Sequence, residues 1–121
     1  WVFLQGKAAS KRWADNFSKS DYKKGAGDSY CTDIYASCHA LAGSFLREIT
    51  PGYPEAAGLL TEAAQLFDKE AENLAQLLPL LGWGAPETDA ERNKKAAALL
   101  KEAAEFYSSA IDLLSVAADK I

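Results

Sequence analysis

The side chains most able to do chemistry are gathered in residues 30–39, which hold both cysteines and the only histidine of the chain. A cysteine with a nearby histidine can act as a nucleophile with its general base. Cys38 and His39 are adjacent, however, and neighbouring side chains on a helix point about 100° apart. A cysteine on an apolar helix face usually packs as a small hydrophobic residue. The pattern favours two buried thiols and a histidine near the surface, so no catalytic residue is predicted.

Residue spacing predicts neither a metal site nor a cofactor. Cys31 and Cys38 are seven residues apart, which separates their Cα atoms by roughly 10.5 Å on one helix. This distance is too long for a disulfide, and the two thiols cannot share a zinc ion. The glycines match neither the dinucleotide nor the Walker phosphate-binding spacing. Several glutamates are interpreted as parts of solvated helix faces, namely Glu62, Glu70, Glu72, Glu102 and Glu105.

An alternative function for the same segment is the binding or conversion of a small ligand. Pockets between helices are typically lined by aromatic side chains with a few polar groups. Such a pocket would lie near Tyr35, Cys38 and His39, with Tyr30 as a further contact. Four aromatic residues could line such a pocket or a partner groove: Trp13, Tyr30, Tyr35 and Trp83. Aromatic residues scattered over apolar faces belong more often to the core, and core packing is therefore the favoured interpretation.

Amphipathic helices must position these residues. Apolar residues recur every three or four positions, which predicts a short helix over about 7–17 and long helices over about 29–49 and 55–78. A fourth helix begins near residue 90 and extends towards the C-terminus.

Several residues mark the expected helix ends. Asp28 or Ser29 is the predicted N-cap of the second helix. Pro79 is expected to end or kink the third helix. The sequence Thr88-Asp89-Ala90-Glu91 has the Thr-x-x-Glu form of a capping box, which predicts Thr88 as the N-cap of the fourth helix.

The predicted fold is an all-α antiparallel bundle of three long helices, with a shorter N-terminal helix covering one side. Short connections make consecutive helices antiparallel neighbours. The length of 121 residues suits a single domain over residues 1–121. Gly43 and Gly58 would stand at a similar height in their helices, where two backbones could approach closely.

Charge and composition limit the possible partners. The net charge is −4, with six Lys/Arg against two Asp/Glu in residues 1–25 and seven against fifteen in the rest. This acidic bulk argues against nucleic acid as a partner, because such binding depends on neutralised phosphates. No run of 18 apolar residues is present, which predicts no membrane-spanning helix. Free thiols suit a reducing compartment, so a cytoplasmic location is predicted.

Three segments resemble one family. Residues 6–17 (Gly-Lys-Ala-Ala-Ser-Lys-Arg-Trp-Ala-Asp-Asn-Phe) resemble the segment that follows the papain-like cysteine peptidase domain in bacterial butirosin-biosynthesis-H-like proteins. Residues 30–48 are similar to the next helix of that family, with an aromatic-Cys start and an Ala-x-x-Phe-Leu-Arg-Glu end. Residues 99–107 (Leu-Leu-Lys-Glu-Ala-Ala-Glu-Phe-Tyr) are similar to its terminal helix.

The resemblance implies that the chain is the helical C-terminal part of a longer protein. It begins with Trp1-Val2-Phe3-Leu4 and contains no methionine, which also indicates a fragment or a processed product. Such families use a Cys–His–Asp set for thiol proteolysis or acyl transfer. That set belongs to the peptidase-like part, and Cys31 and His39 match no catalytic motif of the family.

The leading hypothesis is a non-catalytic helical accessory domain that packs beside a peptidase-like or acyltransferase-like domain. Its partner would be a protein, either an upstream domain or a second copy. The expected docking surface is apolar and includes Trp1, Phe3 and Trp83. A third alternative is a structural homodimer formed through the long helices.

Overall fold

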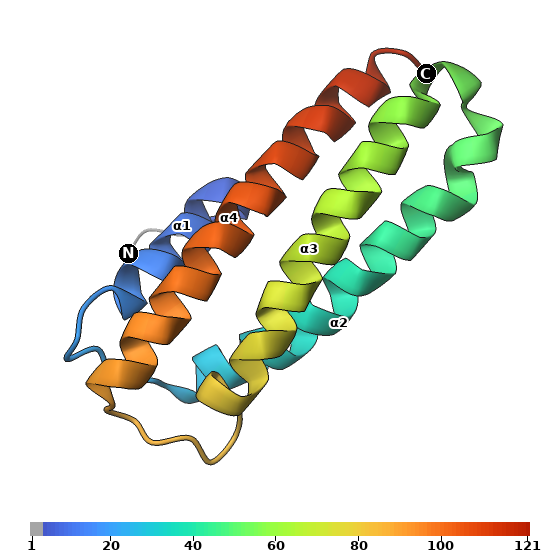
Figure 1. Ribbon diagram of the computed structural model, residues 1–121. Coiled ribbons are helices and arrows are strands. Elements are labelled where there is room, and N and C mark those ends of the chain that lie inside the picture. The colour runs from blue at the N-terminus through green and yellow to red at the C-terminus, as the bar shows by residue number, and fades with distance from the viewer. Residues whose placement is uncertain (1–3) are drawn as a thin grey trace.

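The computed structural model describes residues 4–121, and over these residues the protein is all-α, as predicted. Figure 1 shows four α-helices: α1 (Gly6–Phe17), α2 (Ala26–Ile49), α3 (Ala57–Leu81) and α4 (Ala90–Ala118). Two short 3₁₀ turns, Thr50–Gly52 and Pro54–Ala56, connect α2 to α3. Among the helices of residues 4–121, none is long and apolar enough to cross a membrane.

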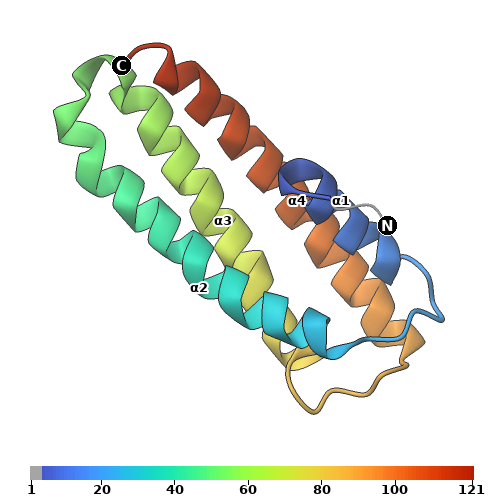
Figure 2. The same cartoon turned by 180° about the vertical axis from the view of Figure 1, so that it is seen from behind.

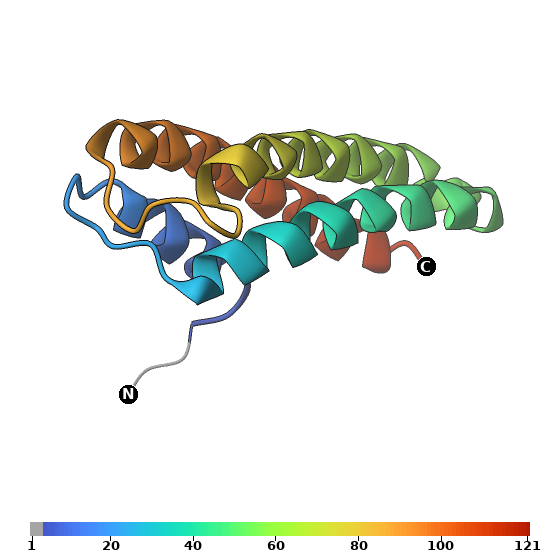
Figure 3. The same ribbon diagram turned by 90° about the horizontal axis from the view of Figure 1, so that it is seen from below.

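The helices pack in the spatial order α1, α4, α3, α2. α3 packs against both α2 and α4, and α1 packs against α4 (Figure 2). α1 has 12 residues and α4 has 29, which corresponds to lengths of about 18 and 43 Å. The short helix therefore covers only part of α4. Seen from below, α1 and the first half of α2 lie on the same side of the α3–α4 pair (Figure 3).

Two apolar clusters form the core on either side of the middle of α3. The first joins α1, α3 and α4 and is built around Phe17, Leu77, Leu81 and Leu100. The second joins α2, α3 and α4 and contains Leu46, Leu60, Phe67 and Ala110. Because α3 contributes to both clusters, it is the central helix of the bundle.

Buried polar side chains at the start of α4 fix the two loops at this end of the bundle. The guanidinium of Arg92 donates to the carbonyl oxygens of Leu80, Pro86 and Glu87. Asn93 is fully buried, and its Nδ2 donates to carbonyl oxygens in the loop between α1 and α2, namely those of Lys19, Ser20 and Tyr22. These bonds connect the α1–α2 loop and the α3–α4 connection to the first turn of α4.

The start of α2 differs from the prediction. The helix begins at Ala26 with Gly25 as its N-cap, so neither Asp28 nor Ser29 is the cap. Asp28 lies at the third helical position and accepts from the backbone N–H of Gly25 at 2.9 Å. Ser29 is buried inside the helix and donates to the carbonyl of Leu81 at 2.7 Å. α2 therefore begins earlier than predicted, within the glycine-rich connection, because the contacts of Asp28 and Ser29 stabilise its first turn.

The ends of α3 and α4 also differ from the prediction. Pro79 lies inside α3, which continues to Leu81. The last turn is held from outside, because Arg92 bonds the carbonyl of Leu80 and Ser29 that of Leu81. The N-cap of α4 is Asp89, whose carboxylate accepts from the N–H of Arg92, so the predicted Thr88 box is wrong by one residue.

The two interior glycines differ in their surroundings. A Cβ at Gly43 would lie 3.2 Å from the carbonyl oxygen of Ala64, so α2 and α3 approach closely there. A Cβ at Gly58 would meet nothing within 4 Å. The predicted close approach therefore holds for Gly43 and is wrong for Gly58.

Replacing Asn93 tests the role of the buried polar bonds. Asn93→Ala should lower the free energy of unfolding by about 2–4 kcal/mol, because the fully buried amide that bonds three carbonyl oxygens of the α1–α2 loop is lost. Urea unfolding measured by circular dichroism gives this value. Lys94→Ala, at an exposed neighbouring position, should change it by less than about 0.5 kcal/mol. Equal stability of the two variants would contradict this role for Asn93.

Candidate ligand-binding cavity

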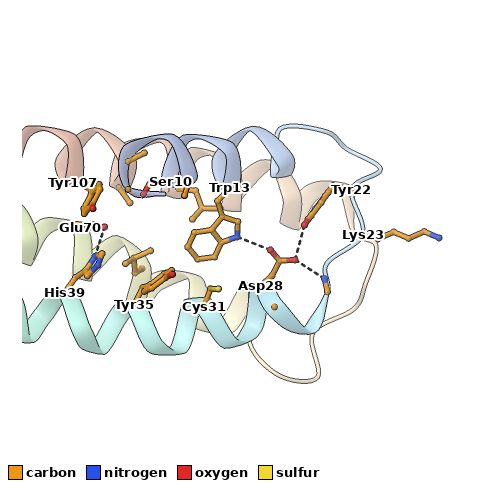
Figure 4. Close-up of a pocket in the computed structure, with 18 residues that line it drawn as sticks. Ser10, Trp13, Tyr22, Lys23, Asp28, Cys31, Tyr35, His39, Glu70 and Tyr107 are labelled. Atoms are coloured by element: carbon orange, nitrogen blue, oxygen red, sulfur yellow. Dashed lines mark hydrogen bonds and ion pairs between the residues drawn. The ribbon is translucent and has the colours of Figure 1, made fainter. Parts of the chain in front are cut away.

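A cavity of about 560 Å³ lies between α1 and α2, and residues of α3 and α4 complete its wall (Figure 4). All four helices contribute lining side chains: Ser10 and Trp13 from α1; Asp28, Cys31, Tyr35 and His39 from α2; Glu70 and Leu74 from α3; Leu100, Ala104 and Tyr107 from α4. The cavity follows from the packing order, because α1 rests on α4 and α2 on α3.

Trp13 is the side chain that bridges α1 and α2. Its indole Nε1 donates to a carboxylate oxygen of Asp28 at 3.0 Å. Its ring also meets that of Tyr35 edge to face, with centroids 6.2 Å apart and an interplanar angle of 73°. One hydrogen bond and one aromatic contact of Trp13 therefore connect α1 to α2 at a defined spacing. The indole forms part of the cavity wall (Figure 4).

Asp28 uses both carboxylate oxygens within the protein. One accepts from Trp13 Nε1, and the other accepts from the Tyr22 hydroxyl at 3.2 Å and the Gly25 N–H at 2.9 Å. Burial, and then the negative charge of Asp28, raise the pKa of the Tyr22 hydroxyl above its ordinary value. Tyr22 therefore stays protonated as a donor to this carboxylate at neutral pH. Asp28 acts as a structural anchor at one end of the cavity.

His39 is held between aromatic rings. Its imidazole stacks on Tyr35 with centroids 5.6 Å apart and on Tyr107 with centroids 5.7 Å apart. The edge contact with Phe67, at 5.9 Å between centroids, fixes the ring from a third side. These contacts orient the imidazole so that Nδ1 lies 2.7 Å from Oε1 of Glu70. That contact has the length of an ion pair but lacks hydrogen-bond geometry, and Nδ1 has no hydrogen-bond partner.

Glu70 is the buried carboxylate of the cavity. Its side chain is 4% exposed, and Oε2 has no hydrogen-bond partner among the described residues. The interpretation of Glu70 as part of a solvated face is therefore wrong. Glu70 follows Phe67 by three residues and precedes Leu74 by four, which places it on the apolar face of α3. That spacing was the signal available in the sequence.

The pocket residues expected from the sequence are brought together only in part. Tyr35 and His39 line the cavity, whereas Tyr30 and Cys38 are exposed outside it. The prediction of two buried thiols is wrong for Cys38, and Cys31 is half-buried. Cys31, Tyr35 and His39 are spaced by four residues, which puts them on one helix face, and Cys38 lies on another. Trp13, one of the aromatic residues considered for a pocket, also lines the cavity, and the residues missed were Asp28, Cys31 and Glu70.

The cavity lacks a cysteine–histidine pair for catalysis. Cys31 and His39 are eight residues apart on α2, so their Cα atoms are separated by about 12 Å. Burial, and secondarily the charge of Asp28, raise the pKa of the Cys31 thiol. A thiol with a raised pKa is a poor nucleophile at neutral pH. Within residues 4–121, no group of three or more His, Cys, Asp or Glu side chains could hold a metal ion.

The expected docking residues contribute little to this site. Trp83 is 65% exposed in the loop between α3 and α4. Trp1 and Phe3 lie outside the described residues. Comparison of the chain with protein-family models, with curated proteins and with solved structures gave no match. The resemblance to butirosin-biosynthesis-H-like proteins stays a prediction, and the cavity has to be interpreted from its own residues.

The two cysteines should differ in alkylation rate. At pH 7.5 iodoacetamide should modify exposed Cys38 at least about tenfold faster than Cys31, because the raised pKa of Cys31 lowers its thiolate fraction. The rate at Cys31 should rise with pH well into the alkaline range. Peptide mass mapping of timed samples measures both rates, and the urea-unfolded chain serves as the control in which they converge. Equal rates in the folded protein would contradict the described environment of Cys31.

Proposed function

We propose that this domain binds a small organic molecule in the cavity between α1 and α2. The observation that carries the proposal is a cavity with aromatic walls that is also lined by Glu70, a buried carboxylate with one oxygen that lacks a hydrogen-bond donor among the described residues. Its volume of about 560 Å³ falls within the range of about 300–1,000 Å³ that is typical of small-molecule sites.

The wall supplies the two kinds of contact that a small ligand needs. Trp13, Tyr35 and Tyr107 present rings against which a flat or apolar body can stack. Glu70 and the Ser10 hydroxyl add a few polar groups that can orient it.

The same residues favour binding without chemical conversion. Cys31 has a raised pKa and is two turns from His39. Of the small-ligand alternative predicted from the sequence, we therefore retain ligand binding and leave out chemical conversion. The proposed binding residues also change. Trp13, Cys31 and Glu70 replace Tyr30 and Cys38 in the proposed site.

A cavity-blocking variant tests this function. In a ligand-observed NMR screen of small aromatic fragments, several should bind the unmodified protein and raise its Tm. Ala104→Leu, which adds volume at a partly exposed lining position on α4, should weaken their binding at least about tenfold. Ala98→Leu, at an exposed position of the same helix, is the matched control and should bind as before. Failure of every fragment, or equal binding by both variants, would contradict the proposal.

A second candidate function is that of the accessory domain predicted from the sequence, which packs against a peptidase-like or acyltransferase-like domain. The docking surface proposed for it is now α2. Besides Tyr30 and Tyr35, α2 exposes three aliphatic or phenyl side chains that define its outward face: Ile34 at 39%, Leu41 at 68% and Phe45 at 58%. Their spacing of seven and four residues places them on one stripe. An exposed apolar stripe of this kind is typical of a helix that packs against a partner.

Charge next to the outward face favours a basic partner over a second copy. Asp33 and Glu48 are exposed beside the stripe. Arg47, the only Lys or Arg of α2, pairs with Asp68 of α3. Two copies of this face would bring like charges together, whereas a partner with an apolar centre and basic rim would complement them.

Model peptides test the outward face of α2. An amphipathic helical peptide with a leucine stripe flanked by lysines should bind the domain, and the same peptide with glutamates should not. Replacing both apolar residues, Leu41→Ser with Phe45→Ser, should weaken binding at least about tenfold in isothermal titration calorimetry. Val116→Ser removes an exposed apolar side chain on α4 and should have no effect. Equal binding of the two peptides would remove this candidate.

A further inference from the structure

We propose that the ligand of the cavity is an organic cation, a protonated amine on an apolar or aromatic body, with its ammonium group bound by Glu70. This inference rests on the proposed binding function and specifies the chemistry of the ligand. Its starting point is the buried carboxylate, because burial of a charge is costly unless a partner compensates it.

Glu70 has capacity for a cationic donor. Its side chain is 96% buried, and Oε2 has no hydrogen-bond partner within the described chain. Oε1 is near Nδ1 of His39 at 2.7 Å. Glu70 is one of the lining residues of the cavity, and Figure 4 marks its contact with His39. A carboxylate accepts most strongly from charged N–H donors.

Asp28, the other carboxylate of the cavity, lacks this capacity. It accepts from Trp13, Tyr22 and Gly25, so both of its oxygens already have donors. The two carboxylates together make the cavity unfavourable for an anion. The local charge therefore selects against anions, and Glu70 alone is left to bind a cation.

The basic residues of the protein do not reach Glu70. Lys23 is the only lysine or arginine among the lining residues, and its side chain points away from the cavity in Figure 4. Lys24 donates to Ser29, and Lys7 pairs with Asp112. Among the described residues, the side chain paired with Glu70 is His39, which lies against one of its two carboxylate oxygens.

The aromatic wall supports the same ligand class. The faces of Trp, Tyr and Phe rings carry partial negative charge and attract organic cations. Trp13, Tyr35 and Tyr107 line the cavity, and Tyr35 and Tyr107 lie on the two sides of His39 close to Glu70. An arylalkylamine would place its ring against Trp13 and its ammonium group towards Glu70.

Three ligands of matched shape test the inference. Tryptamine is the cation, tryptophol its neutral analogue and indole-3-propionate the anion. In NMR titrations at pH 7.5, tryptamine should bind the unmodified protein at least about tenfold more tightly than tryptophol, and indole-3-propionate should bind more weakly than both. Glu70→Gln should reduce the affinity for tryptamine about tenfold and leave that for tryptophol unchanged. Glu72→Gln, on the exposed side of α3, should change neither affinity.

The possible outcomes separate the two proposals. Equal affinity for tryptamine and tryptophol would overturn the cation class and leave the ligand-binding function standing. A cation preference that persists in Glu70→Gln would overturn the role of Glu70. Absence of binding by all three compounds would overturn this ligand class, and only the failure of the wider fragment screen would overturn the binding function as well. The comparison of ligands on the unmodified protein stands even if Glu70→Gln fails to fold.

Discussion

The carboxylate of Asp28 joins three parts of the chain that would otherwise be separate. It accepts from the indole of Trp13 on α1, from the hydroxyl of Tyr22 in the following loop, and from the N–H of Gly25 at the start of α2. Without these bonds the glycine-rich connection would have little to define where α2 begins, because glycine gives the unfolded backbone more conformations. Asp28 therefore fixes both the first turn of α2 and the position of Trp13.

The cavity depends on this anchor and on the unequal helix lengths. α1 is long enough to pack on part of α4 but does not pack broadly against α2. Since α3 fills the space between α2 and α4, the gap that remains between α1 and α2 is crossed mainly by Trp13. The two apolar clusters, one with Phe17 and Leu77 and the other with Phe67, lie on either side of this gap and pack the helices together. A rigid frame thus surrounds a space that its own side chains do not fill.

The number and approximate positions of the helices could be predicted because their apolar residues recur with the helical period. Periodicity does not predict where each helix ends, because the ends are set by contacts between residues that are distant in sequence. Ser29 is bound to Leu81, and Arg92 holds the carbonyl of Leu80, so α2 starts early and α3 continues past Pro79. The site was predicted only in part for a related reason. Tyr35 and His39 were predicted as ligand contacts, but Asp28 was assigned to a helix cap and Glu70 to a solvated face, because no local pattern links them to the pocket.

Glu70 and Asp28 show how environment gives one functional group two roles. Both are carboxylates in the wall of the same cavity. Asp28 lies where a helix begins and two side-chain donors converge, so its charge is compensated by the protein and serves the fold. Glu70 lies in the middle of α3, where the backbone N–H groups are already used by the helix, and only His39 is close to one of its oxygens. A buried carboxylate that the fold leaves partly uncompensated lowers stability unless a donor is supplied. A cationic ligand would supply that donor, so binding would also offset the cost of burying this carboxylate in the folded state.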